Sequence, residues 1–318
     1  MPSPAAPLLM RLLACSASAA VRAGAYVHEV MRSGELGIVI KGHNDLQTQA
    51  DRGAQRLITA NLRAAFPGLT VIGEEEEDPA AAPLGPDEIV EPLDEVLQQC
   101  HRCPEKVQNV RPEDLTVWVD PLDGTSEFAD NLLDNVTVLI GVALEGQAVA
   151  GVVYQPYYRY LTDPSQAGRL VWGLDGLGIF GMGSDSHRPL PTGRVVVTTR
   201  SHDSDTVTAA VTACGPTQTL RVGGCGHKVL LLLERRAHLY IFASAGCKKW
   251  DTCAPEALLR AAGGRLTDIF GRQLRYDPGV ERPNNRGVLA AMRVEDHQRC
   301  VEAMPEDVRQ KLQGPKQS

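Results

Sequence analysis

Acidic residues close apolar runs or open helical patterns in three separated parts of this chain. Asp120 and Asp123 end one apolar run, Glu74 follows another, and Asp251 precedes a helical pattern. Carboxylates brought to one sheet edge repel one another unless cations neutralise them, and clusters with only oxygen ligands suit hard ions such as Mg²⁺. The sequence therefore predicts metal-ion chemistry.

The run from Asp120 to Thr125, DPLDGT, differs from two other acidic signatures. It lacks the alternating acidic residues and distant glutamate of an EF-hand loop. Its aspartates are separated by two residues, whereas phosphatases that form an aspartyl-phosphate have one residue between theirs. Pro121 can bend the chain so that both carboxylates and an intervening carbonyl reach one region, while Gly124 relieves crowding. Thr125 then offers a hydroxyl beside the metals.

Each acidic position also has an ordinary structural interpretation. Asp123-Gly124 suits a turn, Asp251 suits a helix N-cap, and the acidic run 74–78 suits a solvated loop. Taken singly, these interpretations are the better ones. Their joint occurrence at strand ends favours the metal site.

The surrounding sequence alternates between strand and helix patterns. Apolar spacing predicts helices over 46–66, 207–213, 228–235 and 252–262, and a first helix that continues to about Val30. Strands are predicted over 69–73, 115–119, 136–144, 148–154, 194–199, 239–243 and 287–292, with a hairpin turn at Glu145-Gly146. A Pro-rich surface excursion over 79–112 includes one weaker helix, 87–99. The mixture predicts a layered α/β (α+β) fold.

Composition excludes several classes of protein. A net charge of -7 argues against binding to a nucleic acid polymer. The eight cysteines show no framework spacing, which predicts reduced thiols in a cytoplasmic protein. Arg11 interrupts the apolar N-terminus and no charge-free apolar run is long enough to span a bilayer, so neither a signal peptide nor a membrane protein is expected.

Three motifs resemble a known family when taken together. GEE at 73–75, DPLDGT at 120–125 and WDTCAPEALLRAAGG at 250–264 are similar in order and spacing to the motifs of the inositol monophosphatase family of Mg²⁺-dependent, lithium-sensitive phosphatases. The segments TTRSH and RVGGCGHK resemble its nucleotide-hydrolysing members. The resemblance implies a sugar-phosphatase-like α/β/α/β/α sandwich with two sheets between helical layers. It also implies one catalytic unit with a metal-binding lobe, 1–190, and a nucleotide-binding lobe, 191–318.

The resemblance implies a role for each matching residue. Two or three Mg²⁺ ions are expected on the side chains of Glu74, Asp120, Asp123 and Asp251 and the carbonyl of Leu122. Asp51 and Thr125 are expected to take the proton from the attacking water. Substrate contacts are expected from Thr125, Thr199, His202, Gly224 and Lys228. Without the resemblance, Asp51 would be interpreted as a surface charge, His202 as a polar loop residue and the glycine pair as a turn.

The reaction implied is removal of the 3′-phosphate from adenosine 3′,5′-bisphosphate to give AMP and phosphate. Related substrates are 3′-phosphoadenylyl sulfate and inositol 1,4-bisphosphate, so the expected partners are small molecules. Because TTRSH and RVGGCGHK precede helical patterns, their backbone amides are expected to face the substrate anion. The alternatives are an inositol phosphate phosphatase and a non-catalytic nucleotide sensor.

Three positions depart from the family pattern. The stretch Lys41-Gly-His-Asn-Asp45 is one residue shorter than expected, Ser126 replaces the usual lysine, and His227 replaces asparagine. None of these changes removes a proposed metal ligand.

Overall fold

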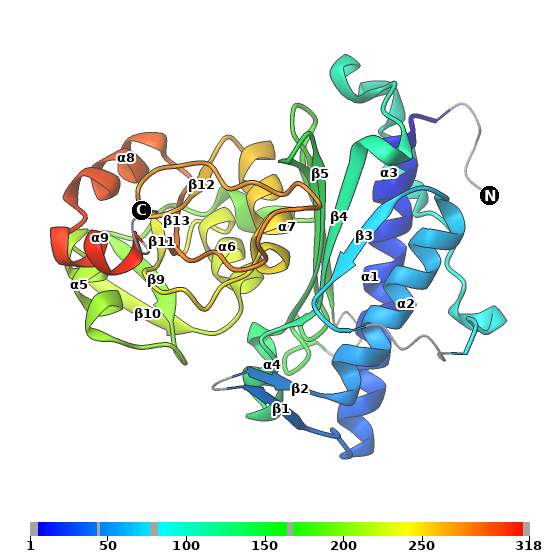
Figure 1. Ribbon diagram of the computed structural model, residues 1–318, viewed down its shortest axis with the longest axis horizontal. Helices are drawn as coiled ribbons and strands as arrows, with labels where there is room; N and C mark the ends of the chain where they lie inside the picture. Colours follow the sequence, from blue (N-terminus) through cyan, green and yellow to red (C-terminus); the bar gives the residue numbers. More distant parts are fainter. Residues whose placement is uncertain (1–5, 43–44, 77–81, 164–167, 314–318) are drawn as a thin grey trace.

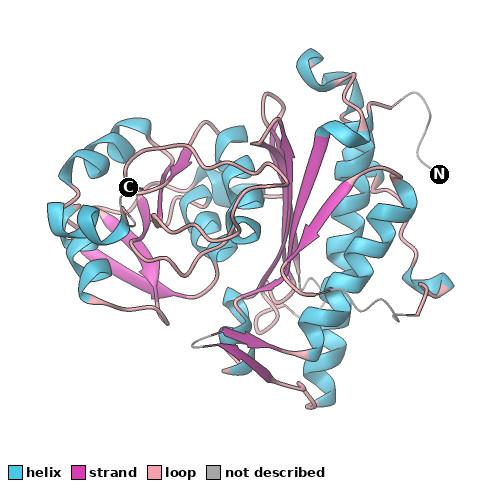
Figure 2. Ribbon diagram, viewed as in Figure 1, coloured by secondary structure: helices cyan, strands magenta, loops and turns pink. Residues whose placement is uncertain are grey.

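Two β-sheets stand between three layers of helices (Figures 1 and 2). The computed structural model describes residues 6–42, 45–76, 82–163 and 168–313. The order of the layers is helix, sheet, helix, sheet, helix, which confirms the predicted α/β/α/β/α sandwich.

The larger sheet has six strands in the order β3-β4-β5-β6-β7-β8. Only β3 and β4 are parallel, and the other neighbours are antiparallel. Because helices cover both faces, its central strands are buried throughout and show no polar alternation. Its strands are Thr70–Gly73, Leu115–Asp123, Thr137–Leu144, Gln147–Gln155, Arg169–Leu174 and Gly178–Phe180.

The smaller sheet has five strands in the order β10-β9-β11-β13-β12. Strands β9, β10 and β11 are parallel, and β13 is antiparallel to both of its neighbours. In chain order, β9 to β13 are Val195–Thr199, Gln218–Val222, Leu239–Phe242, Arg265–Thr267 and Val288–Ala291.

The helices fall into the three layers that Figure 1 separates. α1 (Leu8–Ser33) and α2 (Gln49–Ala65) cover the outer face of the larger sheet. α6 (Cys225–Leu233) and α7 (Lys249–Ala261) lie between the sheets. The outer layer on the smaller sheet is α5 (Asp205–Ala213), α8 (Val294–Ala303) and α9 (Glu306–Leu312). The short elements are α3 (Asp94–Leu97), α4 (Thr125–Ala129) and the hairpin of β1 (Val39–Gly42) with β2 (Asp45–Gln47).

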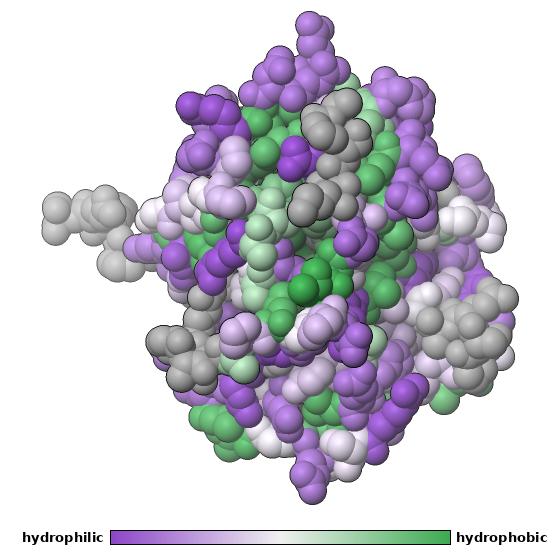
Figure 3. Space-filling view, turned by 90° about the vertical axis from the view of Figure 1, so that its right-hand side faces the viewer, coloured by the Kyte–Doolittle hydropathy of each residue, from purple (hydrophilic) through white to green (hydrophobic). Residues whose placement is uncertain are grey.

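α1 has the length and apolarity of a membrane-spanning helix, but 67% of its most apolar window is buried inside the protein. Its apolar residues pack against α2 and the larger sheet, as predicted for a first helix of the fold. Figure 3 shows the outer face of this layer as mainly polar, with smaller apolar areas between. Burial in the core therefore accounts for the apolarity of α1.

The predicted helix over 87–99 is wrong. The chain forms a 3₁₀ turn at Pro86–Glu88 and one helical turn at Asp94–Leu97. Pro92 separates them, and a proline inside a helix removes a hydrogen bond and clashes with the preceding turn. The helix predicted over 46–66 begins only at Gln49, because Thr48 caps it and the residues before it form β2.

α7 lies directly on the backbone of the larger sheet. Gly141 of β5 and Gly151 of β6 are paired across the ladder. A Cβ on Gly141 would lie 2.5 Å from the Ala254 nitrogen, and a Cβ on Gly151 would lie 2.6 Å from the Ala254 carbonyl oxygen. This close approach fixes the depth at which α7 sits between the sheets.

We expect Gly151→Ala to lower the free energy of unfolding by about 1–3 kcal/mol, since the added methyl must displace α7 backbone in a tightly packed region. Gly279→Ala is the matched control, because no atom lies within 4 Å of its added Cβ. Its effect should stay within about 0.5 kcal/mol. Urea unfolding of both variants provides the measurement, and equal stability of Gly151→Ala and the wild type would contradict the packing described.

Candidate active site

A cavity of about 360 Å³ opens where the carboxyl ends of strands from both sheets meet. The predicted site residues on its wall are Glu74, Asp120, Leu122, Asp123, Thr125, Thr199, His202, Gly224, Lys228 and Asp251. Asp51 lies behind this wall, where its Oδ1 accepts a hydrogen bond of 2.9 Å from the Thr125 hydroxyl. The structure thus brings together all the side chains that the sequence singled out.

Glu74, which directly follows β3, and Asp120 of β4 lie side by side at one end of the larger sheet. β3 and β4 are parallel, and Gly73 is paired with Val119. The next residue of each strand is therefore a carboxylate at the same sheet edge. Asp120 is 2% exposed, and one of its oxygens accepts a hydrogen bond from the Leu122 amide.

The DPLDGT run bends as predicted. The register of β4 with β5 shifts between Asp120 and Asp123, and Gly124 takes a φ of 94°, a left-handed conformation that favours glycine. Thr125 then begins α4, and its hydroxyl lies 3.0 Å from the Leu122 carbonyl oxygen. The bend places Leu122 on the cavity wall with both aspartates.

Asp123 holds the N-terminus of α6. Its two oxygens accept hydrogen bonds of 2.8 Å from the amides of Cys225 and Gly226, and the Thr137 hydroxyl donates a third. The sequence predicted that such amides face a substrate anion, and for Cys225 and Gly226 the structure corrects this. The anion at this helix end is the carboxylate of Asp123 itself. Lys228, one turn into α6, donates to the Gly224 carbonyl at 2.9 Å.

The TTRSH segment also differs from its prediction. Its backbone forms a turn in which the His202 amide donates to the Thr199 hydroxyl at 3.1 Å. α5 begins only at Asp205, and the Ser204 side chain caps it by accepting from the Val207 amide. The cavity is therefore lined here by Thr199, the last residue of β9, and by His202 in the loop that follows, and not by the N-terminus of α5.

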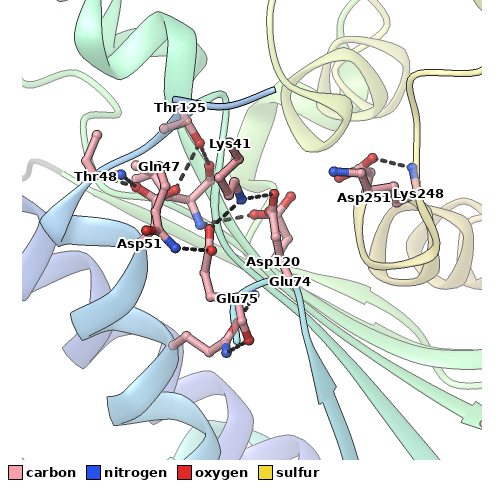
Figure 4. Close-up of polar contacts among 12 residues, drawn as sticks. Lys41, Gln47, Thr48, Asp51, Glu74, Glu75, Asp120, Thr125, Lys248 and Asp251 are labelled. Atoms are coloured by element: carbon pink, nitrogen blue, oxygen red, sulfur yellow. Dashed lines mark hydrogen bonds and ion pairs between the residues drawn. The ribbon is translucent and has the colours of Figure 1, made fainter. Parts of the chain in front are cut away.

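Asp251 belongs to α7 and is not its N-cap. The helix starts at Lys249, so Asp251 is its third residue, and its carboxylate reaches back to accept a 2.6 Å hydrogen bond from the Lys248 amide. Figure 4 shows this contact at the side of the cavity opposite Asp51. The helix cap turns the carboxylate toward the start of α7, at the carboxyl end of the smaller sheet.

Burial raises the pKa of all four carboxylates, and neighbouring carboxylates raise it further for Glu74, Asp120 and Asp123. Burial, with the negative charge of Asp251, raises the pKa of Glu74 to about 8. Burial and the charges of its neighbours hold the pKa of Asp120 well above its usual range. Burial raises the pKa of Asp123 to about 6 against the hydrogen bond from Thr137, and it also raises that of Asp251. Such groups favour a cation among them.

The Lys41 ammonium supplies part of the positive charge that these carboxylates favour. Lys41 Nζ lies 3.2 Å from Glu74 Oε1 and 2.9 Å from Glu75 Oε1 (Figure 4).

Within the described ranges, no three His, Cys, Asp or Glu side chains already form a metal-binding group. Asp123 and Asp251 are held instead by backbone amides. The donor set consists of carboxylate and carbonyl oxygens, which is the chemistry that Mg²⁺ prefers.

Asp51 is fully buried, so its interpretation as a surface charge is wrong. It is the third residue of α2, and the Thr48 amide and hydroxyl both donate to its Oδ2, at 2.6 and 2.5 Å. Burial raises the pKa of Asp51 to about 6, and the hydrogen bonds from Thr48 and Thr125 limit that rise. The carboxylate is thus fixed in one rotamer behind the Thr125 hydroxyl.

Sequence analysis missed Gln55, which orients the acidic segment. Its amide donates to the Glu75 carbonyl at 2.6 Å and accepts from the Glu75 amide at 2.8 Å. Gly73 leaves room for it, since a Cβ there would lie 2.3 Å from the Gln55 amide. Gln55 and Asp51 lie one turn apart on α2, so one helix positions both Glu74 and the buried carboxylate. A lone glutamine in a helix gives no sequence signal of this role.

Lys248 and Ser201 were also missed, although both line the cavity, as does Ser126. The Lys248 ammonium lies 5.5 Å from the centre of the Trp250 ring. Its position next to the WD of the third motif was the available signal. His43 and Asn44 of the shortened Lys41–Asp45 stretch lie outside the described residues.

We expect Gln55→Leu to weaken Mg²⁺ binding about tenfold, because two buried backbone groups of Glu75 lose their partners and Glu74 is no longer held in place. Titration calorimetry gives the dissociation constant directly.

The control is Asn61→Leu, on the same helix. Asn61 also bridges backbone groups, through hydrogen bonds with Leu57, Glu88 and Val90, and none of these bonds reaches the described acidic residues Glu74 and Glu75. Both variants should lose stability, and only Gln55→Leu should lose Mg²⁺ affinity. Equal Mg²⁺ affinity in the two variants would show that Gln55 has no orienting role.

Comparisons with known proteins identify the family of this chain. The model of the inositol monophosphatase family matches residues 9–308. The chain is 47% identical over 310 residues to the 3′(2′),5′-bisphosphate nucleotidase 1 of Mus musculus, covering 96% of this chain and 97% of that protein.

Solved structures share the fold. The extragenic suppressor protein suhB of Bartonella henselae superposes with a TM-score of 0.65 at 21% identity, covering 91% of this chain and 96% of that one. An IMPase/NADP phosphatase complexed with Mg²⁺ and phosphate gives a TM-score of 0.62 at 15% identity, covering 89% and 90%.

Proposed function

The chain belongs to the inositol monophosphatase family, and we propose that it is a Mg²⁺-dependent phosphoric monoester hydrolase that converts adenosine 3′,5′-bisphosphate to AMP and phosphate. The observation that supports this most is the convergence of four carboxylates and the Thr125–Asp51 pair on one cavity, in a chain 47% identical to a bisphosphate nucleotidase. The 3′-phosphate of 3′-phosphoadenylyl sulfate and the 1-phosphate of inositol 1,4-bisphosphate are further proposed targets.

Glu74, Asp120, Asp123 and Asp251, with the Leu122 carbonyl, would hold two or three Mg²⁺ ions. Bound Mg²⁺ lowers the pKa of a coordinated water and neutralises charge on the phosphate in an in-line displacement. The protein contributes the fixed positions of these oxygens. It also contributes buried surroundings in which charge is weakly screened.

Asp51 and Thr125 would together accept the proton of the attacking water. The Thr125 hydroxyl can take that proton as it passes its own to Asp51 Oδ1, 2.9 Å away. This role requires Asp51 to be ionised beforehand, and the two hydrogen bonds from Thr48 favour the ionised form. A protein that only senses the nucleotide has no need of this buried pair.

On the other side of the cavity, Thr199, His202, Gly224 and Lys228 would contact the nucleotide. The buried Lys228 ammonium supplies positive charge near an anionic substrate. The amides of Cys225 and Gly226 already bind Asp123, so the contacts proposed here are the side chains of Thr199, His202 and Lys228 and the backbone of Gly224. We also propose that the protein acts on small molecules in the cytoplasm, where its eight thiols, all in described residues and all free, remain reduced.

The function is tested by phosphate release from adenosine 3′,5′-bisphosphate with and without Mg²⁺, in the wild type and in Asp120→Asn. We expect release that needs Mg²⁺ and is nearly abolished in the variant, since a neutral amide is a poorer ligand for Mg²⁺. Inositol 1,4-bisphosphate measured in parallel identifies an inositol phosphatase. A folded wild-type protein that binds the nucleotide without releasing phosphate would point to a sensor.

The pH profile tests the role of Asp51. Thr48→Val removes one donor from the ionised carboxylate, so the pKa of Asp51 should rise. Because the ionised form is the active one, the acidic limb of kcat/KM should move up by about one pH unit, while activity on the alkaline side changes little. Thr48→Ser retains the hydroxyl and should keep the wild-type profile. An unshifted acidic limb in Thr48→Val would exclude Asp51 as the titrating group.

A further inference from the structure

An ion-pair cluster joins the two sides of the cavity. Arg200 lies in the loop after β9 of the smaller sheet, whereas Glu127 and Asp130 lie in and just after α4, which follows β4 of the larger sheet. Arg200 Nε is 3.1 Å from Glu127 Oε1, and Arg200 Nη2 is 2.7 Å from Asp130 Oδ2. One guanidinium therefore ties a loop of one sheet to a helix of the other.

Each end of this ion-pair link lies close in the sequence to residues of the proposed site. Arg200 follows Thr199 directly and precedes His202 by two residues. The hydrogen bond from the His202 amide to the Thr199 hydroxyl closes this segment into a single turn. On the other end, Glu127 follows Thr125 by two residues. A displacement of Arg200 relative to α4 would therefore move the nucleotide side of the cavity relative to the reacting side.

Glu127 also contacts the second substrate-side segment. It is 3% exposed, and a Cβ on Gly223 would lie 1.9 Å from its carboxyl carbon. Its side chain thus lies against the Gly223 backbone while its carboxylate binds Arg200. Glu127 is the common contact of both segments that would bind the nucleotide.

We propose that Arg200 is a positioning residue that sets the preference for nucleotide over smaller phosphate esters. By holding the loop 199–202 against α4, it fixes the distance between the nucleotide contacts and the carboxylate cluster. A substrate that contacts both sides depends on this distance, while an inositol phosphate that occupies only the reacting side does not. The inference rests on the proposed function, which supplies the nucleotide substrate.

The two halves of the link differ in strength. The Asp130 side chain is 57% exposed, and an exposed ion pair contributes little. The Glu127 carboxylate is buried, so its charged hydrogen bond to Arg200 is the stronger one. Loss of Arg200 should therefore have a much larger effect than loss of the Asp130 charge.

The test measures KM and kcat for adenosine 3′,5′-bisphosphate and for inositol 1,4-bisphosphate in Arg200→Ala, Arg200→Lys and Asp130→Asn. In Arg200→Ala we expect the nucleotide KM to rise about tenfold with kcat nearly unchanged and with the inositol substrate little affected. Arg200→Lys should restore part of the nucleotide KM, and Asp130→Asn should change it about twofold or less. The control Arg111→Ala removes an exposed ion pair with Asp114, which precedes β4 at the end opposite Asp120 and Asp123, and should change the kinetics of neither substrate.

Equal changes for both substrates in Arg200→Ala, or no change for either, would overturn the proposal. AMP affinity, measured by calorimetry in the same variants, separates this result from failure of the proposed function. If the wild type binds AMP but hydrolyses no nucleotide, the proposed reaction fails, and a tenfold loss of AMP affinity in Arg200→Ala still supports the positioning role. If the wild type hydrolyses the nucleotide and Arg200→Ala keeps its AMP affinity and substrate ratio, the positioning role is excluded.

Discussion

The structure depends on holding four carboxylates at one place with little water to screen them. Two like charges a few ångströms apart in a buried setting repel with a free energy that water would reduce severalfold. Opposite charge and hydrogen-bond donors from the protein reduce this repulsion. Lys41 bridges Glu74 and Glu75, and backbone amides bind Asp123 and Asp251. These contacts orient the carboxylates but leave the cluster short of positive charge, which is the electrostatic basis for a divalent cation.

The secondary structure brings the four carboxylates to one place. The parallel strands β3 and β4 place two carboxylates at one end of the larger sheet, and the bend after Asp120 adds a third. α6 starts where Asp123 can bind its amides, so a helix end that could have received substrate stabilises a proposed metal ligand instead. α7, set deep between the sheets by Gly141 and Gly151, brings Asp251. Both sheets and the middle layer of helices therefore contribute residues to the cavity.

The sequence predicted what is local or strongly periodic. The central strands and the bend of DPLDGT follow from patterns within a few residues, which by themselves predict a layered α/β fold. The five-layer arrangement was implied by the resemblance of three motifs to a known family. Contacts between distant residues could not be predicted. Asp123 and Cys225 are about a hundred positions apart, and nothing in RVGGCGHK reveals that its amides bind a protein carboxylate. The edge strand β10 was missed because none of its residues is buried, so it has no apolar pattern.

Mg²⁺ binding measured by calorimetry in two buffers of different ionisation enthalpy tests the central claim most directly. With the pKa of Glu74 raised to about 8, this carboxyl group carries a proton at pH 7 in the metal-free protein, and Mg²⁺ binding must displace it. The account predicts saturable binding that releases about one proton at pH 7 and less at pH 9. Binding that releases no proton at pH 7, or no binding at all, would contradict it.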